Sequence, residues 1–154
     1  MILLKLQRNI PKNFIQLNMI QRVQTVWMLL AVAAIFLTLK TSFYSGTLIT
    51  DNSFHSIMGI DSYGVMILTV ALGTALFVNI FLFKHRMLQF RICIFALLAE
   101  CLIIFIYFSQ IKNYSNGNFS LWCALHLFIL LFIFLAARGI YKDEKLIKDS
   151  NRLR

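Results

Sequence analysis

Residues 92–108 read ICIFALLAECLIIFIYF, an apolar run that a single charged residue, Glu100, interrupts near its middle. Three further runs of similar character occupy residues 23–39, 63–83 and 119–137. Each run is long enough to cross a hydrocarbon layer of about 30 Å as a helix that rises roughly 1.5 Å per residue. None contains proline, and in hydrocarbon a helix pairs every backbone N–H and C=O within its own segment. We therefore predict an all-α polytopic membrane protein, an antiparallel four-helix transmembrane bundle.

The overall composition supports this class of fold. Of the 154 residues, 60% are hydrophobic and 14% are charged, whereas a soluble domain averages about 45–50% and about 25%. A chain of this length has too little interior to hide the surplus apolar surface from water, so lipid must cover it. These proportions exclude an ordinary soluble domain and make the lipid bilayer the first expected partner.

Positive charge alternates between the segments that flank the four runs. The segment before the first run, the turn 84–91 and the segment after the last run hold nearly all the Lys and Arg residues, whereas 40–62 and 109–118 hold one each, Lys40 and Lys112. Cytoplasmic segments of membrane proteins carry such an excess. We therefore expect both termini and the 84–91 turn in the cytoplasm, an N-in/C-in orientation. This distribution also accounts for the net charge of +9, so no nucleic-acid partner is expected.

Both ends of the membrane domain carry distinctive short sequences. Residues 19–22 read MIQR and lead into the first run, while residues 142–144 read KDE and the chain closes on RLR at 152–154. In these features the chain resembles domain of unknown function 4293, an uncharacterised family of four-span bacterial membrane proteins. The resemblance covers about residues 19–154. It implies the fold and a multi-pass location in the bacterial cytoplasmic (inner) membrane, and it implies no reaction, ligand or catalytic residue.

The chain divides into an extension (1–18), a membrane domain (19–137) and a basic tail (138–154). Because the resemblance starts at residue 19, we expect the extension to be a translation-start artefact. The alternative is a short amphipathic arm on the cytoplasmic face. The tail has the charge pattern of a helix, and Gly139 can bend that helix away from the fourth run.

The tail is the segment expected to contact other molecules. A cytoplasmic helix that carries many cations lies on anionic lipid or docks a partner protein, and a solvated, partly frayed helix is the alternative. The candidate contact residues are Lys142, Lys145, Lys148, Arg152 and Arg154.

Glu100 requires a polar neighbour, because a carboxylate at the centre of a membrane helix costs about 2.5–3.5 kcal/mol. The third and fourth runs are joined by a short turn and must pack as antiparallel neighbours. Glu100 precedes Phe108 by eight residues and His126 follows Phe119 by seven, so both lie about 10–12 Å deep and we predict that they meet.

Three roles remain open for Glu100 and His126. They form a proton- or cation-responsive ligand site, they form a clasp that fixes how two helices pack, or Glu100 meets a basic residue of a partner membrane protein. A proton pathway usually shows several acids or histidines at stepped depths, and Glu100 is the only acid in the four runs. That observation favours the clasp.

The outer segment 40–62 is the one long connection in the sequence, KTSFYSGTLITDNSFHSIMGIDS. An unstructured loop of this length is uncommon in a compact domain unless it has a function. Two interpretations remain open, a short hairpin or interfacial lid on the one hand and an unstructured extracytoplasmic loop on the other.

Small residues at close-packing spacing are expected at helix contacts, because they let backbones approach one another. In the first run these residues are Ala31 and Ala34, and in the second run they are Ala71, Thr74 and Ala75.

Residues that carry catalysis or bind metal are not evident in the sequence. The histidines fall in an outer segment, an inner turn and a span, and the three cysteines have no CxxC spacing, so we predict no metal site, no cofactor, no catalytic residue and no enzyme. The sequence favours a small non-enzymatic accessory or assembly subunit. The alternative is a small transporter or proton- or ion-coupled carrier that uses Glu100 and His126.

Overall fold

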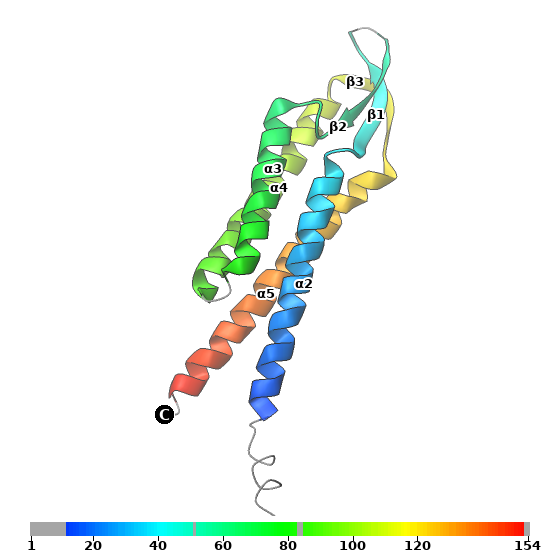
Figure 1. Cartoon of the computed structure of the whole chain (residues 1–154). Helices are drawn as coiled ribbons and strands as arrows, with labels where there is room; N and C mark the ends of the chain where they lie inside the picture. The colour runs from blue at the N-terminus through cyan, green and yellow to red at the C-terminus, as the bar shows by residue number, and fades with distance from the viewer. Residues whose placement is uncertain (1–11, 51, 83–84, 153–154) are drawn as a thin grey trace, which may run out of the picture.

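The computed structural model describes residues 12–50, 52–82 and 85–152, and it shows four long helices with a small sheet at one end (Figure 1). In chain order the elements are the helix α2 (Lys12–Thr38), the strands β1 (Ser42–Leu48) and β2 (Phe54–Met58), the helices α3 (Tyr63–Phe81) and α4 (Arg86–Ile111), the strand β3 (Tyr114–Phe119), the 3-10 turn η2 (Leu121–Cys123) and the helix α5 (Ala124–Arg152). The expected extension 1–18 lies largely outside the described residues, and its last part is helical and continuous with α2.

The four helices form a closed antiparallel ring. Each helix packs against the next one in the chain, and α5 closes the ring by packing against α2. The sheet covers one end of the bundle, here called the sheet end. The described ends of the chain, Lys12 and Arg152, both lie at the opposite end, here called the tail end (Figure 1). There α2 and α5 extend beyond the turn that joins α3 to α4 (Figure 1).

The helices have the length and the surface that suit lipid. Three helical stretches are long and apolar enough to cross a membrane, Tyr63–Phe81, Arg86–Ile111 and Leu121–Leu146, and a shorter apolar helix, Val23–Thr38, accompanies them. Large apolar side chains remain exposed on all four, for example Leu29, Phe77, Phe95 and Leu127. A soluble protein rarely exposes so extensive an apolar surface. The predicted four-run pattern is therefore matched by four apolar helices.

The prediction of an all-α protein is wrong in one respect, because the chain also forms a three-stranded antiparallel sheet in the order β2-β1-β3. The segment 40–62 holds the β1–β2 hairpin, one of the two interpretations left open. The strand β3 was not predicted. Its polar sequence, YSNGNF, is typical of a turn, and it becomes a strand because β1 offers a free edge for pairing. The fourth run was expected from residue 119, but Phe119 ends β3 and α5 begins at Ala124.

Two glycines allow β1 and β3 to approach closely. A Cβ atom on Gly46 would lie 2.9 Å from the Cα of Gly117, and one on Gly117 would lie 2.6 Å from the carbonyl oxygen of Ser45. The strand pairing shifts register at this point, between Ser45 and Thr47. Side chains at these two positions would separate the strands, so the glycines set how the sheet closes over the bundle.

The helix α5 continues without a break through Gly139, the position at which the sequence allows a bend. A Cβ atom on Gly139 would lie 2.6 Å from Cγ of Gln24 on α2, so the missing side chain is what lets α2 and α5 approach here. A buried stripe runs along α5 on the face toward the bundle and continues beyond the end of the predicted fourth run; its members are Ile129, Ile133, Ala136, Ile140 and Asp143.

The expectation about small residues holds for the first span and fails for the second. Ala31 and Ala34 are buried, whereas Ala71, Thr74 and Ala75 are exposed. The Thr74 hydroxyl donates a hydrogen bond of 2.9 Å to the carbonyl oxygen of Val70 in its own helix, so it needs no partner helix. The small residue that α3 places at the contact with α2 is Gly73, and its position faces Ile35 and Phe36.

Replacement of Gly139 by leucine is expected to destabilise the bundle by about 1–3 kcal/mol, because the new side chain would overlap Gln24 and force α2 and α5 apart. The steric cost opposes a gain of somewhat less than about 1 kcal/mol that helix propensity gives to leucine over glycine. Thermal unfolding of the purified protein in mild detergent, followed by circular dichroism, measures the change.

The matched control is Gly64→Leu near the start of α3, where no atom lies within 4 Å of the added Cβ position. This variant should unfold at or above the wild-type temperature. Equal destabilisation of the two variants would contradict the close contact between α2 and α5.

Candidate functional site

The structure brings Glu100 and His126 into contact, as their matched depths predict. His126 Nδ1 lies 2.6 Å from Glu100 Oε1, and both side chains are buried in the bundle. Glu100 comes from the middle of α4 and His126 from the first turn of α5. The contact satisfies the carboxylate within the protein, either as an ion pair with an imidazolium or as a hydrogen bond between neutral groups.

Aromatic rings close this pair off at the sheet end. The His126 ring meets Phe43 of β1 edge-on at 5.4 Å between centroids and Tyr107 of α4 at 5.3 Å. Phe43 and Tyr107 are themselves stacked at 4.5 Å, and both are buried. The sheet therefore does more than cover the bundle, because Phe43 of its central strand packs directly against the buried imidazole.

A second polar contact joins α3 and α4 close to their turn. Asn79 Nδ2 donates to the backbone oxygen of Gln89 at 3.2 Å, and Gln89 Nε2 donates to the backbone oxygen of Asn79 at 3.1 Å. Asn79 Nδ2 also lies 3.3 Å from Cys93 Sγ. Sequence reasoning missed Gln89, because it falls in the segment 84–91 that hydropathy assigns to a turn. The two amides bind each helix to the backbone of the other.

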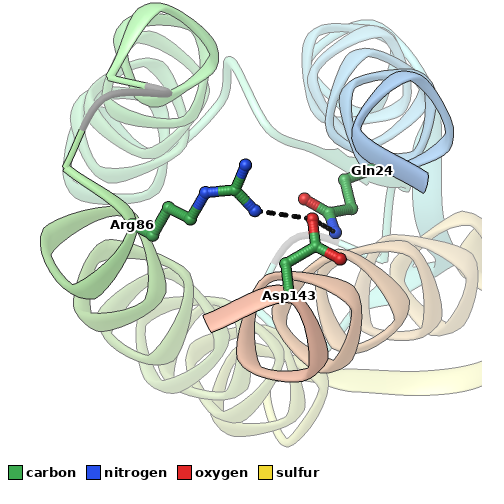
Figure 2. Close-up of polar contacts among 3 residues, drawn as sticks. All are labelled: Gln24, Arg86 and Asp143. Atoms are coloured by element: carbon green, nitrogen blue, oxygen red, sulfur yellow. Dashed lines mark hydrogen bonds and ion pairs between the residues drawn. The ribbon is translucent and has the colours of Figure 1, made fainter. Parts of the chain in front are cut away.

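The third contact is a cluster of charged and amide groups at the tail end, which Figure 2 shows. Asp143 Oδ2 on α5 accepts hydrogen bonds from Gln24 Nε2 on α2 at 2.8 Å and from Arg86 Nη1 on α4 at 2.7 Å. Asp143 is fully buried, whereas the Arg86 side chain is 20% exposed. The other carboxylate oxygen, Oδ1, has no hydrogen-bond partner among the described side chains. One carboxylate thus connects three helices.

This cluster corrects one expectation about the acids of the spans. Asp143 belongs to the bundle interior and lies within the apolar stretch Leu121–Leu146, so Glu100 is not the only acid among the spans. Lys142 and Lys145 are exposed, as expected. The other three tail candidates lie outside what the structure describes, which covers neither the side chains of Lys148 and Arg152 nor any part of Arg154.

The three contacts involve different sets of helices at different levels of the bundle. Within the described part of the chain, no three His, Cys, Asp or Glu side chains are placed to hold a metal ion. Between the Glu100 pair and the Asp143 cluster, the buried face of α4 carries Gln89 and Cys93, which contact Asn79, and the apolar Ala96. The buried face of α5 in the same interval is apolar, with Ile129, Ile133, Ala136 and Ile140. Each carboxylate is therefore paired locally, and the arrangement fixes neighbouring helices against one another.

Long apolar helices around a paired polar interior define a multi-pass membrane protein. Residues 20–153 match the family described as Domain of unknown function (DUF4293), and the chain belongs to that family. This match confirms the family resemblance that the sequences at the two ends of the chain indicate. No curated protein and no solved structure is similar enough to the chain to give a match.

Replacement of Arg86 by methionine is expected to destabilise the protein by about 3 kcal/mol, because it leaves the buried Asp143 carboxylate with Gln24 as its one described donor. The double variant Arg86→Met/Asp143→Leu removes both charges and should recover most of that loss. Unfolding in mild detergent measures each variant.

Lys142→Met is the matched control, since Lys142 is an exposed cation next to Asp143 on the same helix. It should change stability by less than about 0.5 kcal/mol. The buried ion pair would be disproved if Arg86→Met changed stability as little as Lys142→Met. It would also be disproved if the double variant were no more stable than Arg86→Met.

Proposed function

We propose that the protein is a small non-enzymatic accessory or assembly subunit of the bacterial inner membrane, and that its tail end presents fixed cations to a partner. One observation carries this proposal. Asp143 is bonded to two other helices, while Lys142 and Lys145 beside it are exposed. The tail is thus held to the bundle by the Asp143 carboxylate as well as by the packing of α5, while Lys142 and Lys145 remain exposed.

The anchoring bears directly on how well the tail binds. A solvated, frayed helix must be ordered when it docks, and that ordering reduces affinity. Here α5 continues without a break through residue 152 and packs along α2. Lys142 and Lys145 therefore have fixed positions relative to the membrane-spanning helices before any partner arrives.

The charge distribution supports a cytoplasmic location for this surface. The described ends of α2 and α5 lie together at the tail end, with the α3–α4 turn on the same side (Figure 1). The three segments richest in Lys and Arg are those that belong to this end. The positive-inside rule then gives the N-in/C-in orientation, with the sheet outside the cytoplasm.

Affinity purification from native membranes in mild detergent tests this proposal. The double variant Lys142→Gln/Lys145→Gln is expected to lose proteins that co-purify reproducibly with the wild type. The matched control, Lys40→Gln/Lys112→Gln, removes two exposed cations at the sheet end and should keep them.

The variant Asp143→Asn tests the anchoring separately, because it keeps both lysines and removes the ion pair with Arg86. It should retain the same proteins less well than the wild type does. Co-purification that is absent, or that survives loss of Lys142 and Lys145, would contradict the docking role.

A second candidate function is a small transporter or proton- or ion-coupled carrier. The observation that favours it is the direct contact of a buried acid with a buried imidazole, Glu100 with His126, since intramembrane ionisable groups often mark transport pathways. Asp143 adds a second buried acid. On α5 the buried residues between His126 and Asp143 are all apolar, Ile129, Ile133, Ala136 and Ile140. They weigh against a continuous pathway, so this function ranks second.

Proton flux into proteoliposomes that enclose a pH-sensitive dye separates the two functions. As a subunit, the wild type should match empty vesicles, and Glu100→Gln, which keeps the shape of the side chain, should match the wild type. A carrier would instead give flux well above that of empty vesicles, and Glu100→Gln would abolish it while the helical content remained unchanged.

A further inference from the structure

A cleft of about 430 Å³ lies at the sheet end, where the sheet meets the ends of α3 and α4. Leu48 of β1 and Ile57 of β2 form its apolar wall. The polar lining comes from the start of α3, the end of α4 and the start of β3; its members are Asp61, Ser62, Tyr63, Gln110, Asn113 and Tyr114. Elements far apart in the sequence thus build one polar cleft that the proposed function does not use.

Asp61 is the one charged side chain among the lining residues. Its Oδ2 accepts a hydrogen bond from the Met58 backbone N–H at 2.7 Å, and its own N–H donates to the Met58 carbonyl oxygen at 3.2 Å. The carboxylate is held in place by this turn, and Oδ1 has no hydrogen-bond partner among the described residues. Burial, and after it the charge of Asp61, raises the pKa of Tyr114 across the cleft. Because Asp61 is the one charged lining residue, its carboxylate gives the cleft a negative charge that favours a cationic group.

The start of α3 gives the same cleft an anion-binding element. Ser62 is the N-cap of α3, and its side chain makes no capping hydrogen bond. The backbone N–H groups in the first turn of a helix have no acceptor within the helix, and these groups favour a phosphate. Of the first-turn residues of α3, Tyr63 lines the cleft. The side-chain amides of Gln110 and Asn113 add N–H donors to the lining. A cation site and an anion site thus lie side by side.

The position of the cleft identifies the kind of ligand. Tyr63 is the first residue of a helix of membrane-spanning length, and its side chain is 79% exposed. Tyrosines at the ends of spans lie at the level of lipid headgroups. A molecule in the cleft therefore sits where headgroups sit.

From these features we propose that the cleft binds a zwitterionic headgroup that joins a primary ammonium to a phosphodiester, as in phosphatidylethanolamine. The ammonium donates to Asp61 Oδ1, and the phosphate accepts from the first turn of α3 and from the amides of Gln110 and Asn113. A soluble phosphoethanolamine compound has the same chemistry, and the position of the cleft favours the lipid. The site is independent of the tail and of Glu100.

Native mass spectrometry of the full chain tests this site, with an equimolar mixture of phosphatidylethanolamine, phosphatidylcholine and phosphatidylglycerol of identical acyl chains. Phosphatidylcholine has an ammonium without N–H groups, and phosphatidylglycerol has no ammonium. The wild type should retain the first lipid about threefold more than either of the others, in line with the modest strength of an exposed ion pair. Asp61→Asn, which keeps an acceptor for the Met58 N–H, should abolish the preference.

Asn113→Leu is a second variant that does not alter the Asp61 turn, and it should weaken retention of all three phospholipids. Its matched control is Asn118→Leu, which removes an exposed amide of β3 that does not line the cleft, and this variant should behave as the wild type does. Equal retention of the three lipids by the wild type would overturn the proposal, as would an unchanged preference in Asp61→Asn.

Competition with soluble phosphoethanolamine distinguishes the two sources of the headgroup. If millimolar concentrations leave the bound lipid in place, the lipid assignment is supported. Displacement of the lipid would overturn that assignment in favour of a soluble ligand. Because Lys142, Lys145 and Glu100 are intact in every variant, failure of this test leaves the proposed function untouched.

Discussion

Hydrocarbon offers no hydrogen-bond partner, so a buried amide, imidazole or carboxylate in this bundle depends on a partner from a neighbouring helix. The contacts that result bind α4 to α5 through Glu100 and His126 and bind α3 to α4 through the Asn79 amide. Asp143 extends the same principle to α2 and α4 at the tail end. Each contact contributes about 0.6 kcal/mol, whereas a carboxylate left unpaired at the centre of a span costs about 2.5–3.5 kcal/mol. These contacts therefore fix the register of the helices more than they add to stability.

The sequence was sufficient to predict the four helices, and it also paired Glu100 with His126, although both helix ends used in that argument were misplaced. The helix α4 continues to Ile111, beyond the end assumed for the third run, and α5 begins at Ala124, after the start assumed for the fourth. The strand β3 lies between them and runs antiparallel to β1, back toward the bundle. The strand β3 brings the chain back by about as much as α4 is longer than expected. Glu100 and His126 therefore still lie at the same level in the bundle.

The sequence did not reveal the strand β3 or the burial of Asp143, for two different physical reasons. Pairing of β3 with β1 is a contact between distant segments, and the short polar sequence of β3 carries no strand signal of its own. Hydropathy averages all sides of a helix together, and Lys142 and Lys145 beside Asp143 are exposed. The average therefore assigned Asp143 to a polar tail. The spacing of the buried residues along α5 does indicate that Asp143 is buried. Buried positions at Ile133, Ala136 and Ile140 recur every three or four residues, and residue 143 is the next in that series.

The buried aspartate lies beyond residue 138, where the sequence analysis divides the membrane domain from the tail. A buried carboxylate without a partner adds a desolvation cost. The buried position of Asp143 is therefore explained by its partners in the bundle and not by a solvated tail. In this chain the sequence KDE at residues 142–144 places the aspartate inside, against Arg86 and Gln24, while Lys142 points outward. The family match extends through this segment to residue 153. The tail is thus the last part of the bundle itself, and the cations it displays are positioned by the packing of α5 on α2 and α4.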